Sequence, residues 1–243
     1  RQVNRSIALV RGAGHDEDLD AVRLATRTGS VQAQIALDRR NDALLPTAGY
    51  RLTGSALLAA TELGGSDDFV KLSATGSHYL KLGPRILLAQ GVRTDFGLPI
   101  SSAVLPAVER FFGGGDTTVR GLEEDLLLRE VVRTGVAPLP RFEQFRVLPQ
   151  GGNVRLLHNI DLQVQVARFF GFPISVAVFL DTGIVTNSLR GFKVSQLRHS
   201  LGLGLLRWQL PVGFISVEYA IPLDPELGDD PTGRLHFNFG FVF

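Results

Sequence analysis

The chain has 243 residues, enough for one sizeable domain, and its 25 basic side chains almost balance its 24 acidic ones. The formal net charge of +1 argues against a nucleic-acid-binding protein, so no nucleic-acid partner is expected. Cysteine is absent, which excludes disulfide bonds and thiolate metal sites. No run approaches the roughly 18 uninterrupted apolar residues that a membrane-spanning helix needs.

The dominant pattern from the N-terminus onward is the alternation of apolar and polar residues between clusters of Gly, Pro, Asn and Asp, which is typical of β-strands. The first segment, Gln2 to Val10, is expected to be a strand whose phase the sequence does not define. Four further strands are predicted around residues 31–38, 51–58, 70–75 and 85–95. Each of these four carries apolar residues on one face and polar residues on the other.

One connection, from about Gly97 to Gly151, shows no sustained alternation and is far too long for a turn. Loops of this length inside a compact domain are usually functional. The connection contains the glycine-rich run from Phe111 to Gly121. A phosphate-binding loop is a weak alternative for this run, because neither Gly-Lys-Ser/Thr nor a helix follows it.

Five more strands are predicted after this connection, around residues 159–166, 174–181, 201–205, 215–221 and 235–243. In the first of them, Asp161, Gln163 and Gln165 share one face, which a packed soluble core would not tolerate. The phase of the third slips near Arg207, which suggests a bulge.

In the last segment large apolar side chains occupy every second position. They are Leu235, Phe237, Phe239, Phe241 and Phe243, and they alternate with small or polar residues. A soluble core could bury such a face, but a strand with lipid outside and a polar lumen inside is the better interpretation. The sequence therefore predicts an all-β fold, a transmembrane antiparallel β-barrel with about ten strands in this chain.

Five motifs, in a consistent order, resemble the BamA and TamA family of bacterial outer-membrane assembly factors, also called bacterial surface antigens. They are Asp38–Asn41 with Leu45–Tyr50, the loop Gly114–Gly121, Gly151–Asn153, Phe179–Gly183, and Arg207-Trp208 with Pro211–Gly213 continuing through Glu218–Leu223 to Phe243. The resemblance covers nearly the whole chain from about residue 30. One departure is Leu122, which stands where the family has an aromatic residue.

The resemblance implies that the long loop folds back into the lumen, with Gly114, Val119, Arg120 and Gly121 as its motif. The family's docking site for the loop corresponds here to Asp161, Phe179, Asp181 and Gly183. The strand phases agree, because Asp161, Phe179 and Asp181 all fall on the inward face. A guanidinium in a partly dehydrated lumen is well matched by carboxylates and an aromatic ring. Glu218 also falls inward and could pair with lumen arginines.

Barrels of this family have sixteen strands, and the ten predicted strands match the C-terminal ones. We therefore expect residues 1–243 to form a single transmembrane β-barrel domain that is truncated on its N-terminal side. Six strands and the periplasmic repeat domains that precede them would then be missing.

The resemblance implies a protein of the bacterial outer membrane that helps other outer-membrane proteins to fold and insert. In the family a weak seam between the first and last strands opens to pair with the substrate, so Phe237, Phe239, Gly240, Phe241 and Phe243 would belong to the seam. The implied partners are outer-membrane lipids, unfolded outer-membrane proteins, periplasmic repeat domains and accessory lipoproteins. The alternative is a secretion or translocation pore of the two-partner or autotransporter-export type, with a conduit lined by Arg51, Lys71, Arg85 and Arg93.

An enzyme is a third hypothesis, since Asp181-Thr182-Gly183 matches the signature of an aspartic protease. Such enzymes need two carboxylates that share a proton, and the chain has only one such triplet. The five histidines show no metal-ligand spacing. We therefore predict no catalytic residue, no metal and no cofactor.

Overall fold

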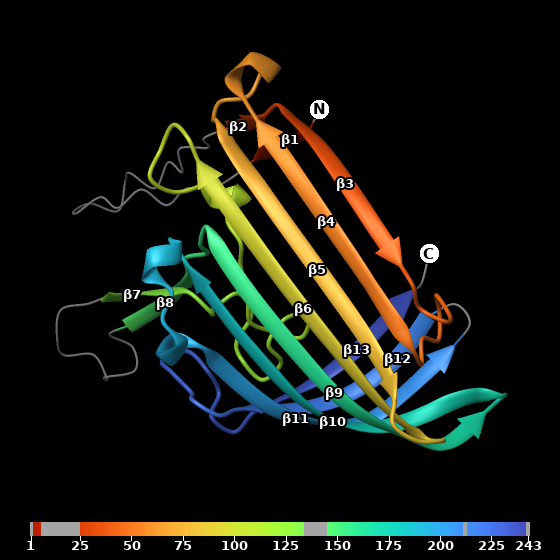
Figure 1. Ribbon diagram of the computed structural model, residues 1–243. Coiled ribbons are helices and arrows are strands. Elements are labelled where there is room, and N and C mark those ends of the chain that lie inside the picture. Colours follow the sequence, from red (N-terminus) through yellow and green to blue (C-terminus); the bar gives the residue numbers. More distant parts are fainter. Residues whose placement is uncertain (1, 6–24, 134–144, 211–212, 242–243) are drawn as a thin grey trace.

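The computed structural model describes residues 2–5, 25–133, 145–210 and 213–241, and nine of its strands form one curved antiparallel sheet (Figure 1). The order across the sheet is β13-β12-β11-β10-β9-β6-β5-β4-β3, so each strand pairs with its neighbour in the chain except where β6 and β9 pair across the long loop. The strands are β3 (Ser30–Asp38), β4 (Gly49–Ala59), β5 (Phe69–Lys81), β6 (Ile86–Pro99), β9 (Val154–Phe169), β10 (Phe172–Thr186), β11 (Arg198–Leu210), β12 (Gly213–Pro222) and β13 (Arg234–Phe241). The predicted all-β antiparallel fold is confirmed.

Two smaller sheets correct the prediction of about ten strands in one barrel wall. The first segment forms β1 (Gln2–Arg5), which pairs with β2 (Ala25–Thr28) apart from the main sheet, while residues 6–10 lie outside the described residues. The long connection, in which the sequence shows no sustained alternation, contains a hairpin of β7 (Arg129–Arg133) and β8 (Phe145–Pro149). Each of these two strands has only five residues, too few for alternation to stand out.

The two faces of the curved sheet differ as the alternation predicts. Every second side chain along each strand faces outward, and many of these side chains are apolar and exposed, among them Ile35, Leu52, Val92, Leu203 and Phe237. The inner face carries charged, amide and hydroxyl groups, and the long loop fills part of the space that this face encloses (Figure 1). An apolar outer face around a polar interior is the pattern of a barrel wall in lipid.

The two ends of the sheet also differ. At one end, here called the short-turn end, three connections have four residues or fewer, 82–85, 170–171 and 211–212, and the fourth, 39–48, is longer. At the other, the long-loop end, they are residues 60–68, 100–153, 187–197 and 223–233. Short 3-10 helices lie in three of these longer connections, at Thr61–Leu63, Ala107–Glu109, Leu189–Gly191 and Val194–Gln196. No helix among the described residues is long and apolar enough to cross a membrane.

A bulge reorients the short-turn half of β11. The register between β11 and β12 shifts between Gly204 and Leu206, next to the position where the sequence phase slips. After the shift Arg207 pairs with Ser216, two residues from Glu218, and its side chain is on the inner face. The bulge therefore supplies a second inward arginine.

Candidate functional site

The long loop returns to the inner face through a closed stem. Phe111 and Gly152 exchange two backbone hydrogen bonds, and the N–H of Leu127 donates to the carbonyl of Gly113 at 2.8 Å. Gly114 has a φ of 112°, and a Cβ there would lie 2.2 Å from a backbone oxygen of the loop, so only glycine fits. The glycines thus let the tip fold tightly enough to enter the lumen.

At the tip, Arg120 is buried and binds acids from three strands of the main sheet, β9, β10 and β12. Its Nε and Nη2 lie 2.7 Å from the two carboxylate oxygens of Asp181 on β10, and Nη1 lies 2.8 Å from Oε2 of Glu218 on β12. Nη2 also lies 3.1 Å from Oδ1 of Asp161 on β9. The guanidinium carbon lies 3.4 Å from the ring centroid of Phe179. A planar cation is well matched by two-pronged carboxylate contacts and an aromatic face.

Burial opposes the charge of Arg120, but its hydrogen bond to Asp181 and the nearby carboxylates outweigh burial and raise its pKa. The guanidinium therefore stays charged in the lumen.

We call Arg120, Asp161, Phe179, Asp181, Arg207 and Glu218 the lumen cluster.

Arg207, a member of the lumen cluster, and Asn159, which lies beside it, make further contacts from the sheet. Arg207 donates to Asp161 at 3.0 Å and lies 2.6 Å from Glu218, so these two acids are shared between two arginines. Asn159 donates to Oδ1 of Asp181 at 2.8 Å and to the carbonyl of Thr118 at 2.7 Å. Neither residue was predicted from the sequence to belong to this site. The inward phase of Asn159, two residues before Asp161, was a signal that could have found it.

Gly183 and a cluster of apolar side chains form the surface against which the loop packs. A Cβ at Gly183 would lie 2.6 Å from Cγ2 of Val119, so this predicted docking residue leaves room for the loop. Leu122, the departure from the family motif, is fully buried with Val119, Leu127, Leu157 and Val185. The leucine thus packs in an apolar cluster that the loop shares with β9 and β10.

The loop tip also reaches the last strand. The N–H of Gly121 donates to Nε2 of His236 on β13 at 3.3 Å. On the outer side of β13, Phe237 and Phe239 are exposed. Gly240 pairs with Phe214, whose ring occupies the space that a Cβ would need. Phe241 ends the described strand, and Phe243 lies outside the described residues.

A second charged group, which the sequence reasoning did not single out, fixes the stem of the loop. Asp95 on β6 is fully buried and accepts from Arg155 at 2.8 Å and from Ser73 at 2.6 Å. Arg155 also donates to the carbonyl of Phe112 in the stem. Asp95 and Arg155 are direct partners in the pairing of β6 with β9. Only knowledge of that pairing across the long loop could have predicted the contact.

At the long-loop end, Asp229 ties the loop to the connection between β12 and β13. Its carboxylate accepts from Arg198 at 2.7 Å, from Arg129 at 3.2 Å and from the backbone N–H of Glu123 at 3.3 Å. The N–H of Glu226 donates to it at 3.0 Å. One buried carboxylate therefore holds three segments together.

Replacing Asp229 with alanine is expected to loosen this end, because charged hydrogen bonds contribute roughly 1.5–3 kcal/mol each. Hydrogen exchange should show the amides of Glu123 and Glu226 exchanging about tenfold faster than in the parent protein. Asp230→Ala is the matched control, since Asp230 hydrogen-bonds only Thr232 in the same connection. Equal protection in both variants would contradict the role of Asp229.

The same contact has a defined pH dependence. Burial alone would raise the pKa of Asp229. The hydrogen bonds from Arg198 and from the N–H of Glu226, together with the positive charge of Arg129, outweigh burial and hold this pKa below its usual value of 3.8. A lowered folded-state pKa means that the stabilisation is complete above the unfolded value and is lost as pH falls through the folded value. Acid should therefore release this end of the loop, and neutral pH should hold it.

The surroundings of Asp181 do not match an aspartic protease. Both of its carboxylate oxygens are bound by Arg120, and Asn159 donates to one of them. A carboxylate held by a buried guanidinium is not one of a pair that shares a proton. Among the described residues, no group of three or more His, Cys, Asp or Glu side chains could hold a metal ion.

An apolar outer face, a charged interior and short turns opposite long loops define the wall of an outer-membrane β-barrel. A family model described as the Omp85 superfamily domain matches residues 13–243. The chain belongs to the Omp85 superfamily. This confirms the family resemblance and assigns the chain to the outer membrane, where short turns of such barrels face the periplasm.

Two individual proteins are similar to the chain. The outer membrane protein assembly factor BamA of Nitratidesulfovibrio vulgaris is 27% identical over 183 residues, which are 74% of this chain and 21% of that protein. The crystal structure of BamA from Haemophilus ducreyi lacking POTRA domains 1-3 has the same fold, with a TM-score of 0.70 at 18% identity over 88% of this chain and 42% of that one. The chain thus spans about a fifth of the first relative and less than half of the second.

Proposed function

We propose that this sheet is part of a barrel that helps other outer-membrane proteins to fold and insert, without making or breaking covalent bonds. The relative from Nitratidesulfovibrio vulgaris carries the name of an assembly factor. The observation that carries the proposal is the connection between the lumen loop and the last strand. Arg120 binds Glu218 on β12, and Gly121 donates to His236 on β13.

In this proposal β13 is one side of a lateral seam. It is the last strand in the order of the main sheet, with β12 as its partner among the described strands. A strand at the end of a sheet can add an incoming strand through main-chain hydrogen bonds, while its side chains select the partner. The exposed Phe237 and Phe239 would lie in lipid beside that incoming strand. The loop would hold β12 and β13 from the lumen side while the seam opens.

The alternative of a secretion pore has less support. Of the four cations expected to line a conduit, Lys71 lies 3.1 Å from Glu109 of the loop and Arg93 lies 3.2 Å from Asp95. Both are therefore neutralised where a conduit would need free charges. The loop itself occupies part of the same interior.

The test is the rate at which a denatured outer-membrane protein folds into vesicles that contain the full-length protein. We expect the full-length protein to accelerate folding, measured by the shift in gel migration of the folded substrate. His236→Ala should lower the acceleration several-fold, because a lost hydrogen bond of roughly 1 kcal/mol uncouples the loop from β13. Asn238→Ala is the control, since Asn238 lies two residues further on the same face of β13.

Steady ion conduction without any acceleration would overturn the proposal in favour of a pore. Equal acceleration by the His236 and Asn238 variants would remove the coupling between loop and seam while leaving the assembly role in place.

A further inference from the structure

A groove of about 510 Å³ crosses the outer face of β4, β5 and β6, on the opposite side of the sheet from the lumen cluster. Its volume falls within the roughly 300–1,000 Å³ that is usual for small-molecule sites. Most of the residues that form it belong to three cross-strand rows on the lipid-facing side of the sheet.

Small residues form the floor of the groove. In one row Gly76 on β5 lies between Leu52 on β4 and Val92 on β6. In the next row Ala74 lies between Gly54 and Thr94. Leu52 and Val92 are exposed and rise on either side of the glycine, which leaves an apolar channel between them. A channel of this kind in a lipid-facing wall fits a hydrocarbon chain.

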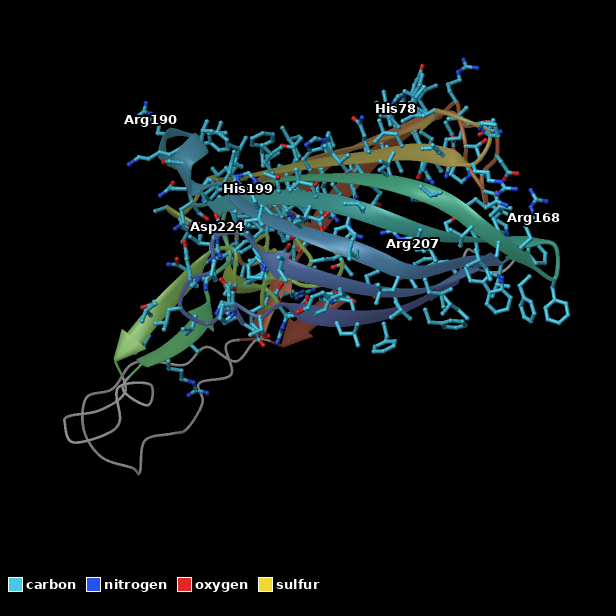
Figure 2. All side chains as sticks on the ribbon, turned by 90° about the horizontal axis from the view of Figure 1, so that it is seen from below. His78, Arg168, Arg190, His199, Arg207 and Asp224 are labelled. Carbon is cyan, nitrogen blue, oxygen red and sulfur yellow. The ribbon has the colours of Figure 1, made fainter. Side chains whose placement is uncertain are left out.

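The end of the groove nearest the short-turn end is polar. Tyr50, His78 and Gln90 form one cross-strand row there, which we call the polar row. Figure 2 shows His78 on the outer side of the curved sheet, away from the enclosed Arg207. Among the described residues, none of these three side chains has a hydrogen-bond partner. Polar side chains that face lipid without a hydrogen-bond partner are unfavourable. We therefore expect a ligand that forms hydrogen bonds to bind at the polar row.

The polar row is not simply the rim of the apolar band. The next outward pair toward the turn is Leu80 with Leu88, and both are apolar. Beyond this pair lie Lys81, the last residue of β5, and Arg85 in the turn, both exposed cations that have no ion-pair partner among the described residues. The order along the wall is therefore apolar channel, hydrogen-bonding row, and positive charge. An amphiphile with an acyl chain, ester oxygens and an anionic phosphate has its groups in the same order.

We propose that this groove binds one phospholipid of the periplasmic leaflet. One acyl chain lies over Gly76 and Ala74 between Leu52 and Val92, and the polar row donates hydrogen bonds to the ester or phosphate oxygens. The phosphate lies at the short-turn end of the strands, where the long side chains of Lys81 and Arg85 reach it around the edge of the wall. The periplasmic leaflet follows from the position of the polar row in the short-turn half of the strands.

The test uses the full-length protein reconstituted in vesicles of phosphatidylethanolamine and phosphatidylglycerol, extracted into mild detergent and examined by native mass spectrometry. We expect the parent protein to retain one phospholipid. Gly76→Phe fills the channel and should abolish retention, and its Cβ would meet only the flexible end of Leu52, at 3.2 Å. His78→Leu keeps the lipid-facing surface apolar and should lower retention roughly two- to tenfold through the lost hydrogen bond.

Leu58→Phe is the matched control, because Leu58 lies on the same face of β4 two rows beyond the groove and is exposed. It should retain phospholipid as the parent does, and heat-dependent gel migration checks that every variant is folded. Equal retention by all variants, or equal loss from the Leu58 variant, would overturn the proposal. Retention of added lipopolysaccharide in place of phospholipid would overturn it as well, since lipopolysaccharide is anchored by several acyl chains rather than one.

Discussion

Replacing Arg120 with alanine is expected to destabilise the folded barrel by about 3–5 kcal/mol, the usual cost of removing one partner from a buried ion pair. The variant leaves Asp181 and Glu218 buried, both almost without solvent contact, and Arg207 lies against only one of them. The measurement is the midpoint of urea unfolding in lipid or detergent, followed by gel migration.

Two further variants define the cause of that loss. Arg120→Lys keeps the charge but lacks the planar fork that holds Asp181 with two nitrogens, so an intermediate loss is expected. Arg40→Ala removes an arginine that pairs with the exposed Asp38 and donates to the carbonyl of Ala43, and an ion pair of this kind is worth about 0–1 kcal/mol. A loss of less than about 1 kcal/mol for Arg120→Ala would contradict the central role of the lumen cluster.

Replacing Gly202 with valine is expected to be the second most damaging change, at about 3 kcal/mol, the upper end of the usual range for overpacking. A Cβ at this position would lie 2.2 Å from Cζ of Phe179 and 2.6 Å from the backbone oxygen of Tyr219. The ring would have to leave the place where it supports the guanidinium of Arg120. Thermal unfolding of the reconstituted protein would measure the loss.

Gly91→Val is the matched control, because a Cβ there would have no neighbour within 4 Å. It should cost only the small difference in strand propensity. Combining Gly202→Val with Phe179→Leu should recover part of the loss, since the smaller side chain vacates the space. No recovery would mean that the backbone of β12, rather than the ring, sets the limit at Gly202.

The main sheet could be predicted from the sequence because lipid and lumen impose opposite demands on alternate residues. That alternation located the strands that became β3 to β6 and β9 to β13. It also placed Asp161, Phe179 and Asp181 on one face. The family resemblance then identified Arg120 as the residue that contacts them. Where a segment is short the same signal fails, as it did for β7 and β8.

The remaining contacts depend on the register between strands, which alternation does not define. Arg207 faces Asp161 only because a bulge in β11 changes the phase of the strand before it. Asp95 meets Arg155 only because β6 and β9 pair across more than fifty intervening residues. Such pairings depend on the register of the whole sheet, so no local sequence pattern predicts them.

The shared acids of the lumen cluster have a consequence for how such sequences can change. Arg120 and Glu218 are 98 positions apart, yet neither can be lost alone without leaving a buried charge uncompensated. Arg207 and Asp161 form a further ion pair within the same cluster. Over generations these distant positions should therefore mutate in concert or not at all, whereas the lipid-facing residues between them can exchange one apolar side chain for another independently.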